Sequence, residues 1–205
     1  MRIEQLKPSQ RVKGRWLAVM EDGSILRVSE GEVIDFALYE GKELTPEEGE
    51  RLAQAARQSG LKEKTLSLLT VKPQSRKELE RKLEQWEASP QESAAICDRM
   101  EELGLLNDEA YAVQVVRHYS AKGYGEHKLR DELYRRGVPR ELWQAALEQA
   151  EDPSRAIDEF VAKKLAGKSP DRKLLQKVSE ALVRRGFCWE DVREALDRYA
   201  LQTDE

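Results

Sequence analysis

The stretch Ala121-Lys-Gly-Tyr-Gly-Glu-His-Lys-Leu-Arg-Asp-Glu-Leu-Tyr-Arg-Arg-Gly-Val138 contains every signal of one short helix and of both its ends. Gly123 and Gly125 can take the positive φ that ends one helix before the next begins. Leu129 and Leu133 lie one turn apart, so they form an apolar ridge on the helix between the glycines. The Arg-Arg-Gly that follows suits the end of a helix, because the basic side chains favour its dipole and the glycine its cap.

This pattern recurs along the chain. A shift of 49 residues aligns Leu133-Tyr-Arg-Arg-Gly-Val138 with Leu182-Val-Arg-Arg-Gly-Phe187, and a backward shift of 50 aligns Leu129 with Leu79. A period of this length indicates a repeat architecture. One such unit is too small to bury much apolar surface alone, so neighbouring units should stack.

Helix starts of similar design surround the stretch. Capping boxes are expected at Thr45-Pro-Glu-Glu48, Ser75-Arg-Lys-Glu78 and Ser89-Pro-Gln-Glu92, and further starts at Asn107, Asp152-Pro153 and Ser169-Pro170. Gly60 is expected to interrupt the first of these helices. The sequence therefore predicts a mainly α fold of tandem three-helix repeats in an elongated, curved array. The predicted repeats are residues 45–107, 108–151 and 152–205.

Residues 1–44 differ from the rest and predict a small N-terminal segment that contains a β-hairpin. The expected strands are 16–20 and 24–28, supported by a strand at 2–6 or a short helix at 33–38. A two-residue turn at Asp22-Gly23 would set Val19 opposite Leu26 on one face.

Composition excludes several classes of protein. Charged residues make up 36% of the 205 residues and the mean hydropathy is −0.73, yet apolar residues recur at helical spacing, which argues against disorder. No apolar run approaches the roughly 20 residues of a membrane span, and the N-terminus lacks the core of a signal peptide. Cys97 and Cys188 are far apart, as expected for reduced thiols in the cytoplasm. The net charge of −4 means that any nucleic-acid binding needs a local basic face.

No catalytic or cofactor motif stands out. His118 and His127 have no cysteine or carboxylate at metal-ligand spacing, and no glycine-rich loop follows a strand. Most carboxylates fall in capping boxes or at i,i+4 spacing from basic residues. We therefore expect neither an enzyme nor a bound metal or cofactor.

Basic residues provide the candidate interaction surface. On the helix expected from Pro170, Lys173, Lys177 and Arg184 fall within a narrow arc, and Lys128 and Arg135 take two of these places in the middle repeat. The pattern is compatible with a solvated charged face or with contact to an anionic partner, either DNA phosphate or an acidic protein groove. The candidate residues are Lys122, Lys128, Arg130, Arg135, Arg136, Lys163, Lys164, Lys168, Arg172, Lys173, Lys177, Arg184 and Arg185.

Three motifs together closely resemble the RecX family of recombination regulators. They are Ser75-Arg-Lys-Glu-Leu, Gly104-Leu-Leu-Asn-Asp-Glu-Ala-Tyr-Ala112, and Ala121-Lys-Gly-Tyr-Gly with Leu129-Arg-Asp-Glu-Leu-Tyr-Arg-Arg-Gly-Val138. The resemblance covers roughly residues 60–200. It implies tandem three-helix repeats and binding in the groove of the RecA–DNA filament, with inhibition of the RecA ATPase, strand exchange and coprotease activities.

The same resemblance places the chain in homologous recombination, DNA repair and the SOS response. We expect the protein to be a cytoplasmic monomer. It implies some direct affinity for single- or double-stranded DNA, weakly or through RecA, and offers no catalytic residue. The alternative is an autonomous helical DNA-binding protein, since three-helix units can place a helix in a groove.

Overall fold

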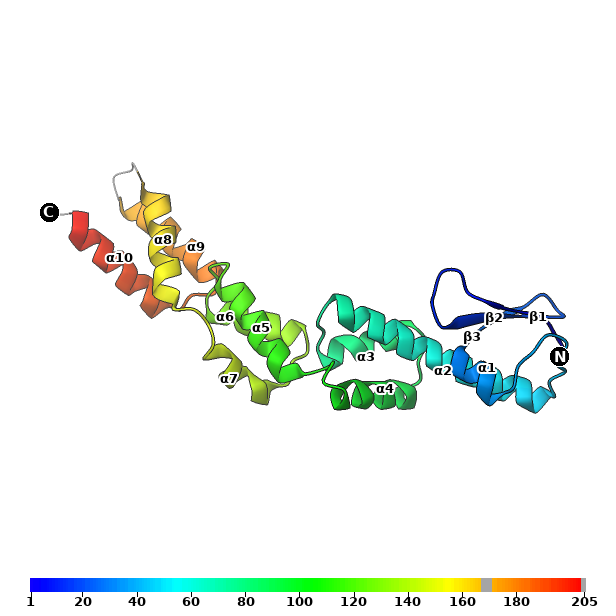
Figure 1. The fold of residues 1–205 in the computed structure, drawn as a ribbon. Helices are drawn as coiled ribbons and strands as arrows, with labels where there is room; N and C mark the ends of the chain where they lie inside the picture. The colour runs from blue at the N-terminus through cyan, green and yellow to red at the C-terminus, as the bar shows by residue number, and fades with distance from the viewer. Residues whose placement is uncertain (167–170, 204–205) are drawn as a thin grey trace. The chain divides into compact units, whose positions relative to one another are not determined.

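The computed structural model describes residues 1–166 and 171–203. Within them the chain forms three strands, ten α-helices and one short 3-10 helix (Figure 1). In chain order these are β1 Ile3–Pro8, β2 Arg15–Met20, β3 Ile25–Ser29, α1 Glu30–Asp35, α2 Pro46–Val71, α3 Arg76–Gln85, α4 Pro90–Glu102, α5 Asp108–Ser120, α6 Glu126–Arg135, η1 Arg140–Leu142, α7 Trp143–Leu147, α8 Pro153–Leu165, α9 Arg172–Arg184 and α10 Trp189–Thr203. The mainly α fold with a small N-terminal β segment is confirmed.

The chain divides into two compact units. The first comprises Met1–Pro73 and Glu80–Glu102, and the second comprises Gln74–Leu79 and Leu103–Glu205. In the first unit an antiparallel sheet of order β1-β2-β3 packs on α2 (Figure 1). Its core consists of Ile3, Ala18, Met20, Val28, Leu38, Leu44, Leu52 and Ala56.

The predicted hairpin exists, but its predicted register is wrong by one residue. Ala18, not Val19, lies opposite Leu26. The reason is a three-residue loop: the Met20 amide donates to the carbonyl of Ser24, and Gly23 takes a φ of +80°. A one-residue slip exchanges the faces of a strand, so Ala18 and Met20 point into the core.

Helix α2 begins at the predicted Thr45 capping box and ends at Lys72, before Pro73. The interruption expected at Gly60 does not occur, and the helix runs through it. A glycine inside a helix costs about 1 kcal/mol. Leu52 and Leu61 are buried on either side of Gly60, and burial of each side chain is worth about 1.5–3 kcal/mol, which offsets that cost.

The second unit contains two hydrophobic clusters built on the same plan. Helices α5, α6 and α7 surround one cluster, which contains Tyr111, Val116, Leu129 and Leu133. Helices α8, α9 and α10 surround the other, formed by Ile157, Val161, Leu165, Val178, Leu182, Phe187, Val192 and Ala195. Each set is a helix triplet in which the second helix supplies buried apolar residues, Leu129 and Leu133 from α6 and Val178 and Leu182 from α9.

Most helix starts lie where the capping signals predicted them. The boxes at Ser75 and Ser89 both form, and Asn107 accepts a hydrogen bond from the Ala110 amide. Ser169 and Pro170, where a further start was predicted, lie outside the described part of the chain. In the described part, Asp171 caps α9, and its Oδ1 accepts a hydrogen bond from the Leu174 amide at 2.6 Å.

Candidate interaction surface

Helix α9 carries four basic residues and one acidic residue, and three of the basic residues share one face. Its N-cap is Asp171, and its apolar side, with Val178 and Leu182, is buried in the third triplet. Because a helix advances about 100° per residue, Lys173, Lys177 and Arg184 fall within an arc of about 40° on the opposite side. All three are exposed. We call these three residues the α9 basic row.

The α9 basic row is only weakly neutralised from within the chain. Arg184 lies 3.9 Å from Glu180, in a pair whose side chains are 70% and 52% exposed. Such exposed pairs contribute about 0–1 kcal/mol and leave most of the charge to solvent. Lys173 and Lys177 have no hydrogen-bond or ion-pair partner in the described part of the chain. The row is therefore available to an external anion.

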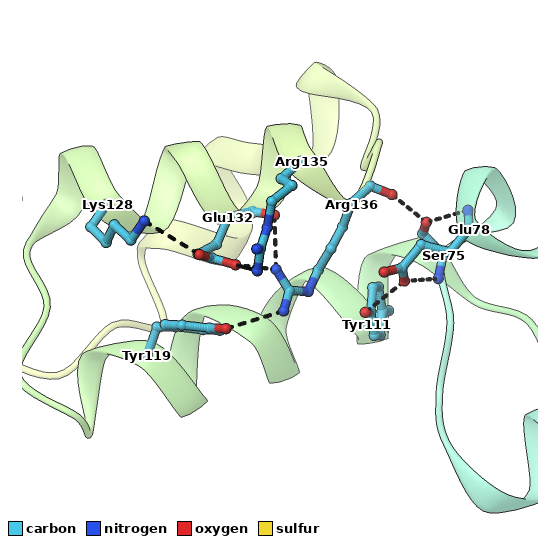
Figure 2. A network of polar contacts seen from close by, with 8 residues as sticks. All are labelled: Ser75, Glu78, Tyr111, Tyr119, Lys128, Glu132, Arg135 and Arg136. Carbon is cyan, nitrogen blue, oxygen red and sulfur yellow. Dashed lines mark hydrogen bonds and ion pairs between the residues drawn. The ribbon is translucent and has the colours of Figure 1, made fainter. Parts of the chain in front are cut away.

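In helix α6 the cations at the equivalent positions are paired with a carboxylate. Figure 2 shows Lys128, Arg135 and Arg136 converging on the Glu132 carboxylate. Lys128 Nζ lies 3.5 Å from Glu132 Oε1, Arg135 Nη2 lies 2.6 Å from Oε2, and Arg136 Nη1 donates to the same Oε2. Glu132 is only 4% exposed.

The electrostatics of Glu132 are set by two opposing effects. Burial works to raise the pKa of its carboxyl, but the hydrogen bonds from Arg136 and Arg135 outweigh burial and hold the pKa below its ordinary value. Glu132 is therefore ionised near neutral pH and neutralises the cations around it. The 49-residue shift places Ala181 at this position in α9, so the third triplet lacks the carboxylate.

The charge balance of the two helices differs accordingly. Helix α6 has three basic and three acidic residues, whereas α9 has four basic residues and one acidic residue. This contrast was missed at the level of sequence, where the two basic pairs look alike. The signal was present: Glu132 stands four residues after Lys128 and three before Arg135.

The Arg-Arg doublets separate into an outer and an inner arginine. The outer members, Arg135 and Arg184, have side chains 67% and 70% exposed. The inner Arg136 is 16% exposed, donates to the Tyr119 hydroxyl at 3.2 Å and lies 5.3 Å from the centre of that ring. The inner Arg185 lies 4.6 Å from the centre of the Phe160 ring. The inner arginines thus serve internal contacts.

The remaining candidates lie at several places on the second unit. Arg130 is paired with Glu126 at 2.6 Å, and Lys122 lies over the Tyr119 ring at 5.6 Å. Lys163, Lys164 and Arg172 are exposed, with Lys164 5.6 Å from the centre of the Phe160 ring. Lys168 lies outside the described residues.

The network in Figure 2 continues to the opening turn of α3, Gln74–Leu79, which belongs to the same unit. Tyr111 donates to Glu78 Oε2 at 2.8 Å, and the Ser75 hydroxyl donates to the Arg136 carbonyl. Burial raises the pKa of the Tyr111 hydroxyl, and the hydrogen bond to Glu78 adds to this effect. Tyr111 therefore stays protonated and acts as a donor.

A hollow of about 260 Å³ lies beside Gly125 in the second unit. Its lining includes four carboxylates and no basic side chain: Glu126, Glu151, Asp152 and Asp191. Burial raises the pKa of the Cys188 thiol at its wall. This lining repels anions, so the hollow cannot hold a phosphate group. Among the described residues no group of three or more His, Cys, Asp or Glu is placed to hold a metal ion.

No helix formed by the described residues combines the length and apolar character needed to span a membrane.

Comparison with known proteins gives a consistent match. Three family models match the chain: the first three-helix domain of RecX at residues 62–100, the second at 107–147 and the third at 150–196. "Regulatory protein RecX" from Chromohalobacter salexigens is 35% identical over 132 residues, which cover 64% of this chain and 87% of that protein. The protein of the same name from Streptococcus gordonii is 23% identical over all of this chain and 80% of its own length.

Two solved structures share the fold. A crystal structure of regulatory protein RecX aligns with a TM-score of 0.70 at 22% identity and covers 96% of this chain and 98% of its own. The crystal structure of RecX from Lactobacillus salivarius aligns with a TM-score of 0.66 at 21% identity, over 72% of this chain and 99% of its own.

Proposed function

Because the chain belongs to the RecX family of regulatory proteins, we propose that it binds the RecA–DNA filament and inhibits RecA. The protein acts without catalysis, as a cytoplasmic monomer that occupies the filament and competes with subunit addition or with the second DNA. RecA ATP hydrolysis, strand exchange and coprotease activity fall together. The protein then serves as a regulator in homologous recombination, DNA repair and the SOS response.

The observation that carries the proposal is the α9 basic row. Its three cations share one exposed side of a helix and face no carboxylate at the position that Glu132 occupies in α6. A row of this kind favours contact with a DNA phosphate backbone or an acidic protein groove, both of which a coated DNA strand can offer. Because the whole chain has a net charge of −4, such attraction needs a local basic face of this kind.

The experiment measures RecA ATP hydrolysis on single-stranded DNA with substoichiometric amounts of this protein. The wild-type chain should lower the rate, and the triple variant K173E/K177E/R184E should lower it less, at unchanged helix content. A matched control is K7E/R11E/K13E, which reverses three exposed charges in the first unit and changes the net charge equally. No inhibition by the wild-type chain would refute the function. Equal loss in both triple variants would refute the role of the α9 basic row.

A second candidate function is autonomous DNA binding through the same row. It predicts binding to bare duplex without RecA, with an affinity that falls on a log–log plot against salt by about 0.9 per phosphate contact. If all three cations contact phosphates, the slope is about −2.7. Undetectable or salt-insensitive binding would exclude this function and leave filament binding in place.

A further inference from the structure

The Leu-x-Arg-Arg-Gly motif recurs in two triplets, and the interaction surface uses only its outer arginine. The rest of the motif is turned inward, and the structure shows what it contacts. In the third triplet, the Arg185 carbonyl accepts from the Gly125 amide at 3.0 Å, and the Gly186 carbonyl accepts from the His127 amide at 3.0 Å. These bonds join the end of α9 to the start of α6.

The bonds complete a helix end that has no other cap. Gly125 is the N-cap of α6 and offers no side chain to the first-turn amides; the Lys128 amide donates to the Gly125 carbonyl at 3.0 Å, but the His127 amide has no acceptor within the helix. The carbonyl of Gly186 fills that role for His127. The helix start in the second triplet is therefore satisfied by the motif of the third.

The approach is so close that only glycine fits. A Cβ on Gly125 would lie 2.4 Å from the backbone of Gly186 and of Phe187. A Cβ on Gly186 would lie 2.4 Å from the amide nitrogen of Lys128, and Gly186 also holds a φ of +92°. By contrast, Gly125 has φ −83° and ψ 172°, which any residue can adopt. Position 125 therefore requires glycine because the backbone of Gly186 lies so close to it, and not because of its own backbone conformation.

The other copy of the motif makes a related contact through a side-chain hydroxyl. The Arg136 carbonyl accepts from the hydroxyl of Ser75, the N-cap of α3, and a Cβ on Gly137 would lie 2.6 Å from the side chain of Lys77. Ser75 and Gly125 are equivalent under the shift of 50 residues. In both copies the inner arginine stacks on an aromatic ring from the first helix of its own triplet, Tyr119 or Phe160.

We propose that Leu-x-Arg-Arg-Gly of the third triplet is a docking motif that caps the start of α6 and holds the second and third triplets at a fixed spacing. The inner arginine, Arg185, holds the turn against its own triplet through the Phe160 ring. The carbonyls of Arg185 and Gly186 accept hydrogen bonds from the start of α6. The contact with α6 is made through backbone atoms, so it does not depend on the charge of the doublet. This inference does not rest on the proposed function.

Hydrogen exchange measured by NMR on the intact protein tests the proposal. The His127 amide should exchange nearly as slowly as that of Leu133 in the core of α6, and much more slowly than that of Lys173. Lys173 stands at the same second position of α9, and its amide has no acceptor outside its own helix in the described part of the chain. If the His127 amide exchanges as fast as the Lys173 amide, this measurement on the wild-type chain is enough to overturn the proposal.

The variant Gly125→Ala then opens the junction without straining its own backbone. It should speed exchange at His127 by about tenfold, while Leu133 stays protected because each triplet keeps its own core. Gly60→Ala is the matched control, since a Cβ there meets nothing within 4 Å. Unchanged exchange at His127, or an equal acceleration at Leu133, would contradict a separate junction.

Discussion

Replacing Glu132 by glutamine removes one negative charge from beneath three cations while it keeps the shape of the side chain. Arg136 is the critical partner, because its side chain is 16% exposed and it loses a charge-assisted hydrogen bond worth about 1.5–3 kcal/mol. Lys128 and Arg135, 36% and 67% exposed, lose pairs worth about 0.3–0.5 kcal/mol each. We expect a loss of about 2–4 kcal/mol in the free energy of unfolding.

Urea denaturation at a series of pH values measures this loss and its pH dependence. Because the folded pKa of Glu132 lies below the unfolded value of about 4.3, its contribution is full above that value and disappears as pH falls through the folded pKa. The difference between wild type and Glu132→Gln should therefore be constant from about pH 8 to about pH 5 and shrink below about pH 4. Glu126→Gln, on the exposed pair with Arg130, is the control and should cost at most about 0.5 kcal/mol.

A difference below about 1 kcal/mol at neutral pH, or one that persists unchanged to pH 3, would refute the reasoning. The first result would mean that Arg136 finds an equally good partner without the carboxylate. The second would mean that the effect comes from packing and not from ionisation of Glu132.

Two further substitutions separate charge from stability. Ala181→Glu gives α9 the carboxylate of α6, so Lys177 and Arg184 should become paired with it. RecA inhibition should then weaken, and the slope of any salt dependence of DNA binding should decrease in magnitude by about 1.8. Undiminished inhibition would show that these two cations do not make the contact. Leu133→Ala empties a position that is 0% exposed and should cost about 2–5 kcal/mol in urea denaturation, while protein that remains folded should still inhibit RecA; a loss below about 1 kcal/mol would contradict the burial.

Helix starts could be predicted because their signals are local. A capping box joins residues three apart, so Ser75 with Glu78, and Ser89 with Glu92, form their paired hydrogen bonds whatever the rest of the chain does. The helix ends at Gly137 and Gly186 follow from a positive φ that glycine alone adopts readily.

Features that depend on distant packing were not predictable in the same way. Asp22-Gly23 fits a two-residue turn and also the last two places of a three-residue loop, and burial of Ala18 and Met20 against the first unit's core selects the second. In the second unit, residues 139–150 are compatible with one continuous helix that begins at Pro139, but they form a 3-10 turn at Arg140–Leu142 and the short α7 at Trp143–Leu147.

The functional surface was the least predictable part, because sequence shows charge but not its partner. Arg135 and Arg136 are adjacent and chemically identical, yet one is largely exposed and the other is buried against Tyr119. The 49-residue repeat suggested that α6 and α9 present the same face. Their difference depends on a single position, Glu132 or Ala181, whose effect requires knowing that three cations reach one carboxylate.

Two sets of positions in the repeat therefore differ in the substitutions that they accept. At the junction, a Cβ on Gly125 or on Gly186 would lie 2.4 Å from backbone atoms across the contact, so neither position admits a side chain. The position of Glu132 in α6 and Ala181 in α9 instead sets the charge of the second helix, because the carboxylate pairs with three cations in α6 and the alanine leaves Lys177 and Arg184 without it. A chain built in this way can keep its repeats in register while each repeat presents its own charge. Interaction with an anionic partner should then be concentrated on the third triplet, even though the second has the same arginine doublet.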